Sequence, residues 1–254
     1  MRGIIKYVLL TATRDWLFLG LFFMIIIASG LSIFLGSNAL SEQHLMQLAY
    51  ISGSTRMILV IGMILFICFH IRRSFDNREI EFIISRPISR VSFIVAYFIA
   101  FSLLALLIAI PVSIFIGVIF RPSFTGLALW SISLYFELIM ISAFSILAAL
   151  ILRSAVSAVM GCLAFYIISR MMGFAVASII LPGSISGINF TKFLELILKF
   201  FSLFLPRLDQ FAKSKWLVYG TVEPEIINLV LIQSAIYIPL ILLMAIFDFQ
   251  RKQF

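Results

Sequence analysis

The chain has 254 residues, of which 63% are apolar and only 12% are charged, and its mean hydropathy is +1.18. Soluble domains average roughly 45–50% apolar and about 25% charged residues, so the composition excludes an ordinary soluble protein and indicates a polytopic membrane protein. Cytoplasmic loops and lipid headgroups explain the net charge of +8 without nucleic acid. Cys68 and Cys162 lie in separate apolar runs and predict neither a disulfide framework nor a zinc site.

Six segments are apolar over about 20 residues, the length that a helix needs to cross a bilayer. Strands of alternating polarity are absent, and open backbone is not tolerated in lipid, so the expected spans are helices. The sequence predicts an all-α membrane protein with six transmembrane helices in a single domain, residues 1–254. The expected spans are Leu17–Gly36, Thr55–Ile71, Val91–Phe120, Leu127–Leu152, Ala155–Leu181 and Ile226–Phe247.

The basic residues predict the orientation of these spans. An even number of spans leaves both termini on one side of the membrane. Eleven of the 19 basic residues then lie on the side of the termini, six lie on the opposite side, and Arg56 and Arg170 fall within spans. Because cytoplasmic loops carry an excess of Lys and Arg, this distribution favours cytoplasmic termini.

The stretch before the first span, residues 1–16, is expected to form an amphipathic interfacial helix. Its apolar residues recur at helical spacing, whereas its basic residues take other angles around the helix. An ordinary juxtamembrane start to the first span is the alternative. The apolar positions are Ile4, Ile5, Val8, Leu9, Ala12 and Trp16.

The connection between the fifth and sixth spans, residues 182–225, is expected on the outer side and is too long for a simple turn. Apolar residues gather between Phe193 and Phe204, and Pro206 follows them. A helix of about 14 residues cannot cross a bilayer. An interfacial or re-entrant helix is therefore expected in this connection.

The connection between the second and third spans, residues 72–90, is the most highly charged part of the chain. Eight of its 19 residues are charged, yet Phe75, Ile80, Ile83 and Ile84 supply an apolar side at helical spacing. A short amphipathic helix that Pro87 ends is expected. Such a helix on the cytoplasmic face either lies against lipid or inserts into a groove of a soluble partner, and composition leaves both possibilities open.

Residues 79–90 also carry a family resemblance. Glu79, Glu81 and Ile83-Ile84 precede the run Ser85-Arg86-Pro87-Ile88-Ser89-Arg90. This arrangement resembles the type-2 ATP-binding cassette (ABC) exporter permeases, whose pattern is Glu, a spaced Ile or Leu, and then Leu-Leu-Ser-x-Pro-Ile-Ser-Arg. It most resembles the branch that includes the permease for maturation of the copper enzyme nitrous oxide reductase. The expected N-terminal helix, six spans and external segment agree with the general architecture of that family.

The resemblance implies that Phe75–Ile84 is a coupling helix that seats in a separate ATP-binding subunit. No G-x-x-x-x-G-K-[ST] run occurs in the 254 residues, so ATP hydrolysis is expected in that partner and the chain itself is expected to be non-catalytic, without cofactor or metal. The family further implies a second copy of the chain and the inner (plasma) membrane of a bacterial cell. The expected contact residues are Phe75, Asp76, Arg78, Glu79, Ile80, Glu81, Phe82, Ile83, Ile84, Ser85, Arg86 and Pro87.

A second candidate site follows from counting residues along the spans. Glu137 and Arg170 each lie 16.5 residues from the middle of the expected turn at Arg153 and Ser154. At a rise of 1.5 Å per residue, both lie about 25 Å above that turn, and Arg56 on the second span reaches a similar level. Opposite charges at one depth in lipid are expected to pair or to face a polar cavity. We therefore expect an intramembrane charge layer in which Glu137 neutralises Arg170 or Arg56, either bordering a transport route or serving as a purely structural ion pair.

Three other functions compete with an ABC permease at this point. The same architecture could pass ATP-driven motion to a periplasmic partner instead of moving a solute. A secondary transporter would use buried carboxylates near the midplane, and Glu137 alone qualifies. An intramembrane protease would need a Ser nucleophile and a His at matching depth, which the sequence does not provide.

Overall fold

The computed structural model describes residues 2–14, 16–38, 42–77, 89–180, 205–220 and 224–251. These residues form helices joined by turns, with no β-strand among them. In chain order the elements are α1 (Arg2–Arg14), α2 (Trp16–Ser37), α3 (Gln43–Asp76), α5 (Arg90–Phe120), α6 (Phe124–Ile151), α7 (Ala155–Ile180), η1 (Leu208–Gln210), α9 (Ser214–Tyr219) and α10 (Pro224–Arg251).

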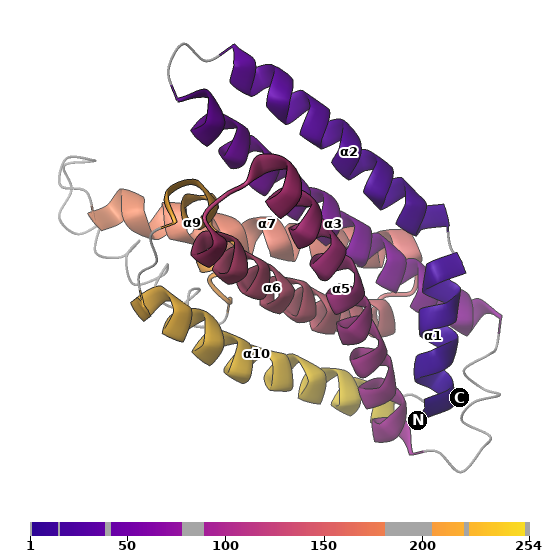
Figure 1. Cartoon of the computed structure of the whole chain (residues 1–254). Helices are drawn as coiled ribbons and strands as arrows, with labels where there is room; N and C mark the ends of the chain where they lie inside the picture. The colour runs from indigo at the N-terminus through magenta and orange to yellow at the C-terminus, as the bar shows by residue number, and fades with distance from the viewer. Residues whose placement is uncertain are drawn as a thin grey trace.

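Within the described ranges, six helices are long and apolar enough to cross a membrane. They are α2, α3, α5, α6, α7 and α10, and they run roughly side by side in one bundle (Figure 1). This confirms the predicted all-α fold with six candidate spans, and it is the architecture of a multi-pass membrane protein.

The helix α6 lies at the centre of the bundle. It packs against α3, α5, α7 and α10, and 78% of its apolar window is buried, compared with 22% for α10. A charged side chain on α6 therefore lies inside protein and away from lipid. The turn from α6 to α7 falls at residues 152–154, where the sequence predicted it, and the Ser154 hydroxyl accepts a hydrogen bond from the Ser157 amide at 3.1 Å.

The second span is longer than the sequence predicted. The expected boundary at Thr55 is wrong, because α3 begins at Gln43 and continues for 34 residues to Asp76. The added turns carry polar side chains that lower the local hydropathy without breaking the helix. Two contacts hold these turns: the Ser32 hydroxyl donates to the backbone carbonyl of Gln47 at 2.6 Å, and the His44 ring lies 2.7 Å from the backbone carbonyl of Phe120.

The N-terminal helix α1 packs on α5. Ile4, Val8 and Ala12, which follow one another at four-residue spacing, are buried. The apolar stripe of this helix thus meets protein. The prediction that Trp16 continues this face is wrong, since α1 ends at Arg14 and Trp16 begins α2 with 83% of its surface exposed.

The two ends of the bundle differ in what they carry. At one end lie α1, the end of α3, the start of α5 and the end of α10 (Figure 1). Here Arg90 donates to the carbonyls of Phe249 and Gln250 at 3.2 and 3.0 Å, which joins the first residue of α5 to the last turn of α10. At the opposite end, residues 205–220 lie against α3, α6 and α7.

Candidate functional site: a buried charge layer

Two of the charged residues within the spans, Glu137 and Arg170, meet between α6 and α7. The Glu137 side chain is fully buried, and its Oε1 lies 3.3 Å from Nη1 of Arg170, whose side chain is 21% exposed. The same oxygen accepts a hydrogen bond from the Tyr166 hydroxyl at 3.1 Å. The ion pair expected from the depth of these residues is therefore present.

Arg170 also holds backbone from a distant part of the chain. Its Nη1 donates to the carbonyl of Leu208 at 2.6 Å and to that of Phe211 at 3.1 Å. Neither carbonyl belongs to a regular α-helix, because Leu208 begins the three-residue 3-10 helix η1 and Phe211 follows its last residue. The guanidinium thus bridges the carboxylate on α6 and the irregular backbone of residues 208–211.

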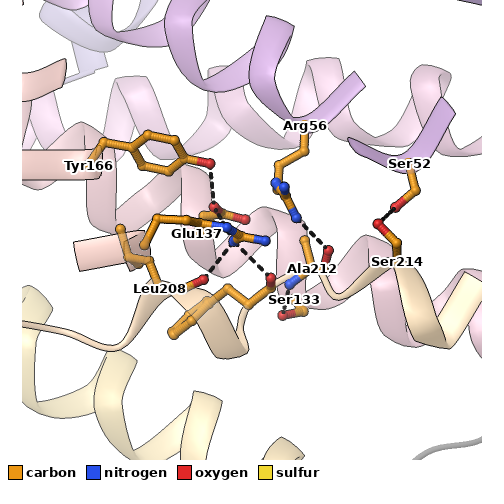
Figure 2. Close-up of polar contacts among 10 residues, drawn as sticks. Ser52, Arg56, Ser133, Glu137, Tyr166, Leu208, Ala212 and Ser214 are labelled. Carbon is orange, nitrogen blue, oxygen red and sulfur yellow. Dashed lines mark hydrogen bonds and ion pairs between the residues drawn. The ribbon is translucent and has the colours of Figure 1, made fainter. Parts of the chain in front are cut away.

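Arg56 makes a parallel contact from α3. Its Nη1 donates to the carbonyl of Ala212 at 3.1 Å. The backbone amide of Ala212 in turn donates to the Ser133 hydroxyl of α6 at 2.9 Å. One turn before Arg56, the Ser52 hydroxyl donates to that of Ser214 at 3.0 Å. Figure 2 shows these contacts converging on the same stretch of backbone from different helices.

We call residues 205–220 the inserted segment. Five of its apolar side chains are buried beside the charge layer: Leu208, Phe211, Ala212, Trp216 and Leu217. Two glycines allow its close approach. A Cβ on Gly126 would overlap the Trp216 carbonyl, and a Cβ on Gly173 would overlap the Asp209 carboxylate.

The inserted segment extends into the bundle, past the first turns of α6, as far as Ser133. Ser133 lies nine residues from Phe124, the start of that helix, which is about 14 Å at 1.5 Å per residue. Irregular backbone at such a depth needs acceptors and donors from protein, because lipid supplies none. Arg56 and Arg170 supply the donors, and Glu137 offsets part of their charge.

Of the two arginines expected to compete for Glu137, Arg170 is the one that pairs with it. Glu137 pairs with Arg170, whereas Arg56 uses a neutral carbonyl as its hydrogen-bond acceptor. Sequence reasoning missed three polar partners, although a signal for them was present. Each charged residue has a polar residue four positions earlier on the same helix face: Ser52 before Arg56, Ser133 before Glu137, and Tyr166 before Arg170.

The two cysteines lie in separate parts of the sequence, but the fold brings them together. The Sγ atoms of Cys68 on α3 and Cys162 on α7 lie 3.9 Å apart, and both residues are buried as free thiols. Across the described part of the chain, no group of three or more His, Cys, Asp or Glu residues is placed to hold a metal ion.

The predicted coupling helix lies mostly outside the described residues. Phe75 and Asp76 form the end of α3, where Asp76 lies 3.7 Å from Arg72 and the Arg72 guanidinium lies 5.5 Å from the centre of the Phe75 ring. Residues 78–88, which include Arg78 to Pro87 of the predicted contact, are not described, and neither is the apolar stretch 193–204 for which an interfacial or re-entrant helix was predicted.

Comparison of the sequence with models of known protein families gave no match, and comparison with curated proteins gave none either.

Proposed function

We propose that the chain is the membrane permease subunit of an ABC exporter, located in the inner membrane of a bacterial cell with cytoplasmic termini. Two copies would form the pathway, and two ATP-binding subunits would dock beneath them on residues 75–87. ATP-driven closure of those subunits would push on the coupling segment and tilt the helices attached to it. The chain itself makes and breaks no covalent bond.

The course of α3 is the observation that carries this proposal. One unbroken helix runs from the contact of Arg56 with the inserted segment to Asp76, the last helical residue before the charged connection. Twenty residues separate the two positions, which is about 30 Å along the axis. A continuous helix transmits displacement as a rigid body, so force applied at the charged connection would reach the charge layer.

The other end of the charged connection, at Ser89 and Arg90, is fixed to α5 and α10 by hydrogen bonds. Ser89 caps α5 by accepting a hydrogen bond from the Ser92 amide at 3.2 Å. The next residue, Arg90, holds the last turn of α10 through two backbone carbonyls. A push on residues 77–89 would therefore move α3 on one side, and α5 with α10 on the other.

Association with an ATP-binding subunit tests the proposal. Ile83→Asp and Phe82→Asp place a charge on the expected docking segment. Either change should weaken co-purification of the full-length chain with the ATPase expressed beside it by at least about thirtyfold, as expected for a buried interface residue. Ser154→Asp is the matched control, because it adds the same charge to the exposed α6–α7 turn at the same end of the bundle.

Membrane insertion of all three variants is checked by extraction with detergent and not with carbonate. Retained association of Ile83→Asp and Phe82→Asp would contradict the coupling role. The mechanotransmission alternative has its own signature: co-purification of a soluble periplasmic protein, together with an ATPase rate that no solute raises.

A further inference from the structure

The charge layer holds more positive than negative charge. Among the described residues of the layer, Arg56 and Arg170 are opposed by one carboxylate, that of Glu137. The neighbouring Arg207 and Asp209 cancel each other as an ion pair at 3.2 Å. Within these described residues, one unit of positive charge therefore remains among apolar helices. Such a charge is expensive at membrane depth, and ionisable residues kept there generally serve a function.

Arg56 is the less satisfied of the two guanidinium groups. A guanidinium has five N–H donors in a planar fork that matches the oxygens of a carboxylate or phosphate. Arg56 uses Nη1 for the Ala212 carbonyl, and its buried Nε has no acceptor among the described residues. Donor capacity thus remains unused beside Ala212.

The inserted segment has the chemistry of a replaceable ligand. It offers carbonyl oxygens to both guanidinium groups, at Leu208 and Phe211 for Arg170 and at Ala212 for Arg56. Its buried apolar side chains fill the adjoining space. A molecule able to take its place would need acceptor oxygens joined to an apolar body. A negatively charged group would satisfy the excess charge that neutral carbonyls leave.

We propose that Arg56 and Arg170 form a binding site for the anionic head group, phosphate or carboxylate, of an amphiphilic molecule. The carbonyls of the inserted segment occupy this site in the present structure. Naming this amphiphile as the substrate rests on the proposed function; the binding site itself does not.

Quenching of tryptophan fluorescence by brominated lipids tests the site in the full-length protein. Trp130 on α6 and Trp216 on the inserted segment are 0% and 3% exposed, whereas Trp16 is exposed. A Trp16→Phe background, in phosphatidylcholine nanodiscs, therefore reports mainly on the enclosed pair. Brominated phosphatidylglycerol should quench more strongly than brominated phosphatidylcholine at equal mole fraction. Arg56→Gln should weaken the apparent association of the anionic lipid by about tenfold.

Arg121→Gln is the matched control, because it removes an exposed positive charge at the same end of the bundle and should leave the preference unchanged. If Arg56→Gln does not fold, Arg56→Lys should keep a weakened preference, since lysine retains the charge without the fork. Equal quenching by the two lipids in the parent protein, or an unaltered preference in the folded Arg56 variant, would overturn the inference.

A third arm identifies the source of the anion. Inorganic phosphate without anionic lipid should not raise the melting temperature of the parent. If it does so, and only with Arg56 present, while phosphatidylglycerol shows no preference, the ligand is a free anion and the amphiphile is excluded. None of these measurements involves the ATPase, so loss of lipid preference and loss of partner association are separate failures.

Discussion

Removing one member of the Glu137–Arg170 pair should destabilise the bundle, and the two removals should differ in size. Breaking a buried ion pair from one side costs about 3–5 kcal/mol. Glu137→Gln belongs near the low end, about 3 kcal/mol, because Arg170 is 21% exposed and keeps two carbonyl acceptors. Arg170→Gln belongs near the high end, about 5 kcal/mol, because it strands a fully buried carboxylate and releases the inserted segment.

Thermal unfolding followed with a thiol-reactive dye measures both effects, since Cys68 and Cys162 are buried until the bundle opens. For a chain of this size, a change of 1 kcal/mol shifts the melting temperature by roughly 2–4 °C. We therefore expect losses of about 6–12 °C for Glu137→Gln and about 10–20 °C for Arg170→Gln. The double variant should recover about 2–3 kcal/mol relative to the sum of the single changes, because it leaves neither partner alone.

Two results would refute this reasoning. Single variants that melt with the parent would show that the pair contributes nothing to the fold. A double variant equal to the sum would show that the two side chains act independently, despite their 3.3 Å separation. Arg121→Gln, an exposed change, should stay within about 0.5 kcal/mol of the parent.

Three further predictions concern other contacts. Gly126→Ala should destabilise the protein by about 1–3 kcal/mol and speed trypsin cleavage in the inserted segment. Gly30→Ala, whose Cβ meets nothing within 4 Å, should do neither. Equal stability and equal cleavage rates of the two variants would contradict the close packing at Gly126. A membrane-permeant oxidant should convert Cys68 and Cys162, whose Sγ atoms lie 3.9 Å apart, into an intramolecular disulfide. The readout is the loss of two titratable thiols. Two surviving thiols would show that α3 and α7 lie farther apart. Arg90→Gln should accelerate amide exchange in the last turn of α10, and unchanged exchange would show that its contacts there are unimportant.

The number of spans could be predicted from the sequence because hydropathy and length are local properties. The level of Glu137 and Arg170 could be predicted as well, because a tight turn between two helices fixes their register. The start of α3 could not be found in this way. Its first turns are polar, and their partners, Ser32 and the Phe120 carbonyl, come from other helices.

The position of the inserted segment could not be predicted from the sequence either, for a related reason. Arg56 and Arg170 hold it through backbone carbonyls, and a carbonyl carries no sequence signature. A lone arginine in a span predicts a partner but not one 156 residues away. The polar residues four positions before each charge do mark the helix faces that meet, and similar pairs could be sought in other membrane proteins.

The unbroken length of α3 turns small angles into large displacements. With about 30 Å between Asp76 and Arg56, a tilt of about 5° about the Asp76 end of α3 would carry Arg56 sideways by about 2.6 Å. A hydrogen bond of 3.1 Å tolerates only a few tenths of an ångström of stretch. A movement of a few degrees at one surface of the membrane is therefore enough to part a guanidinium from its carbonyl near the other.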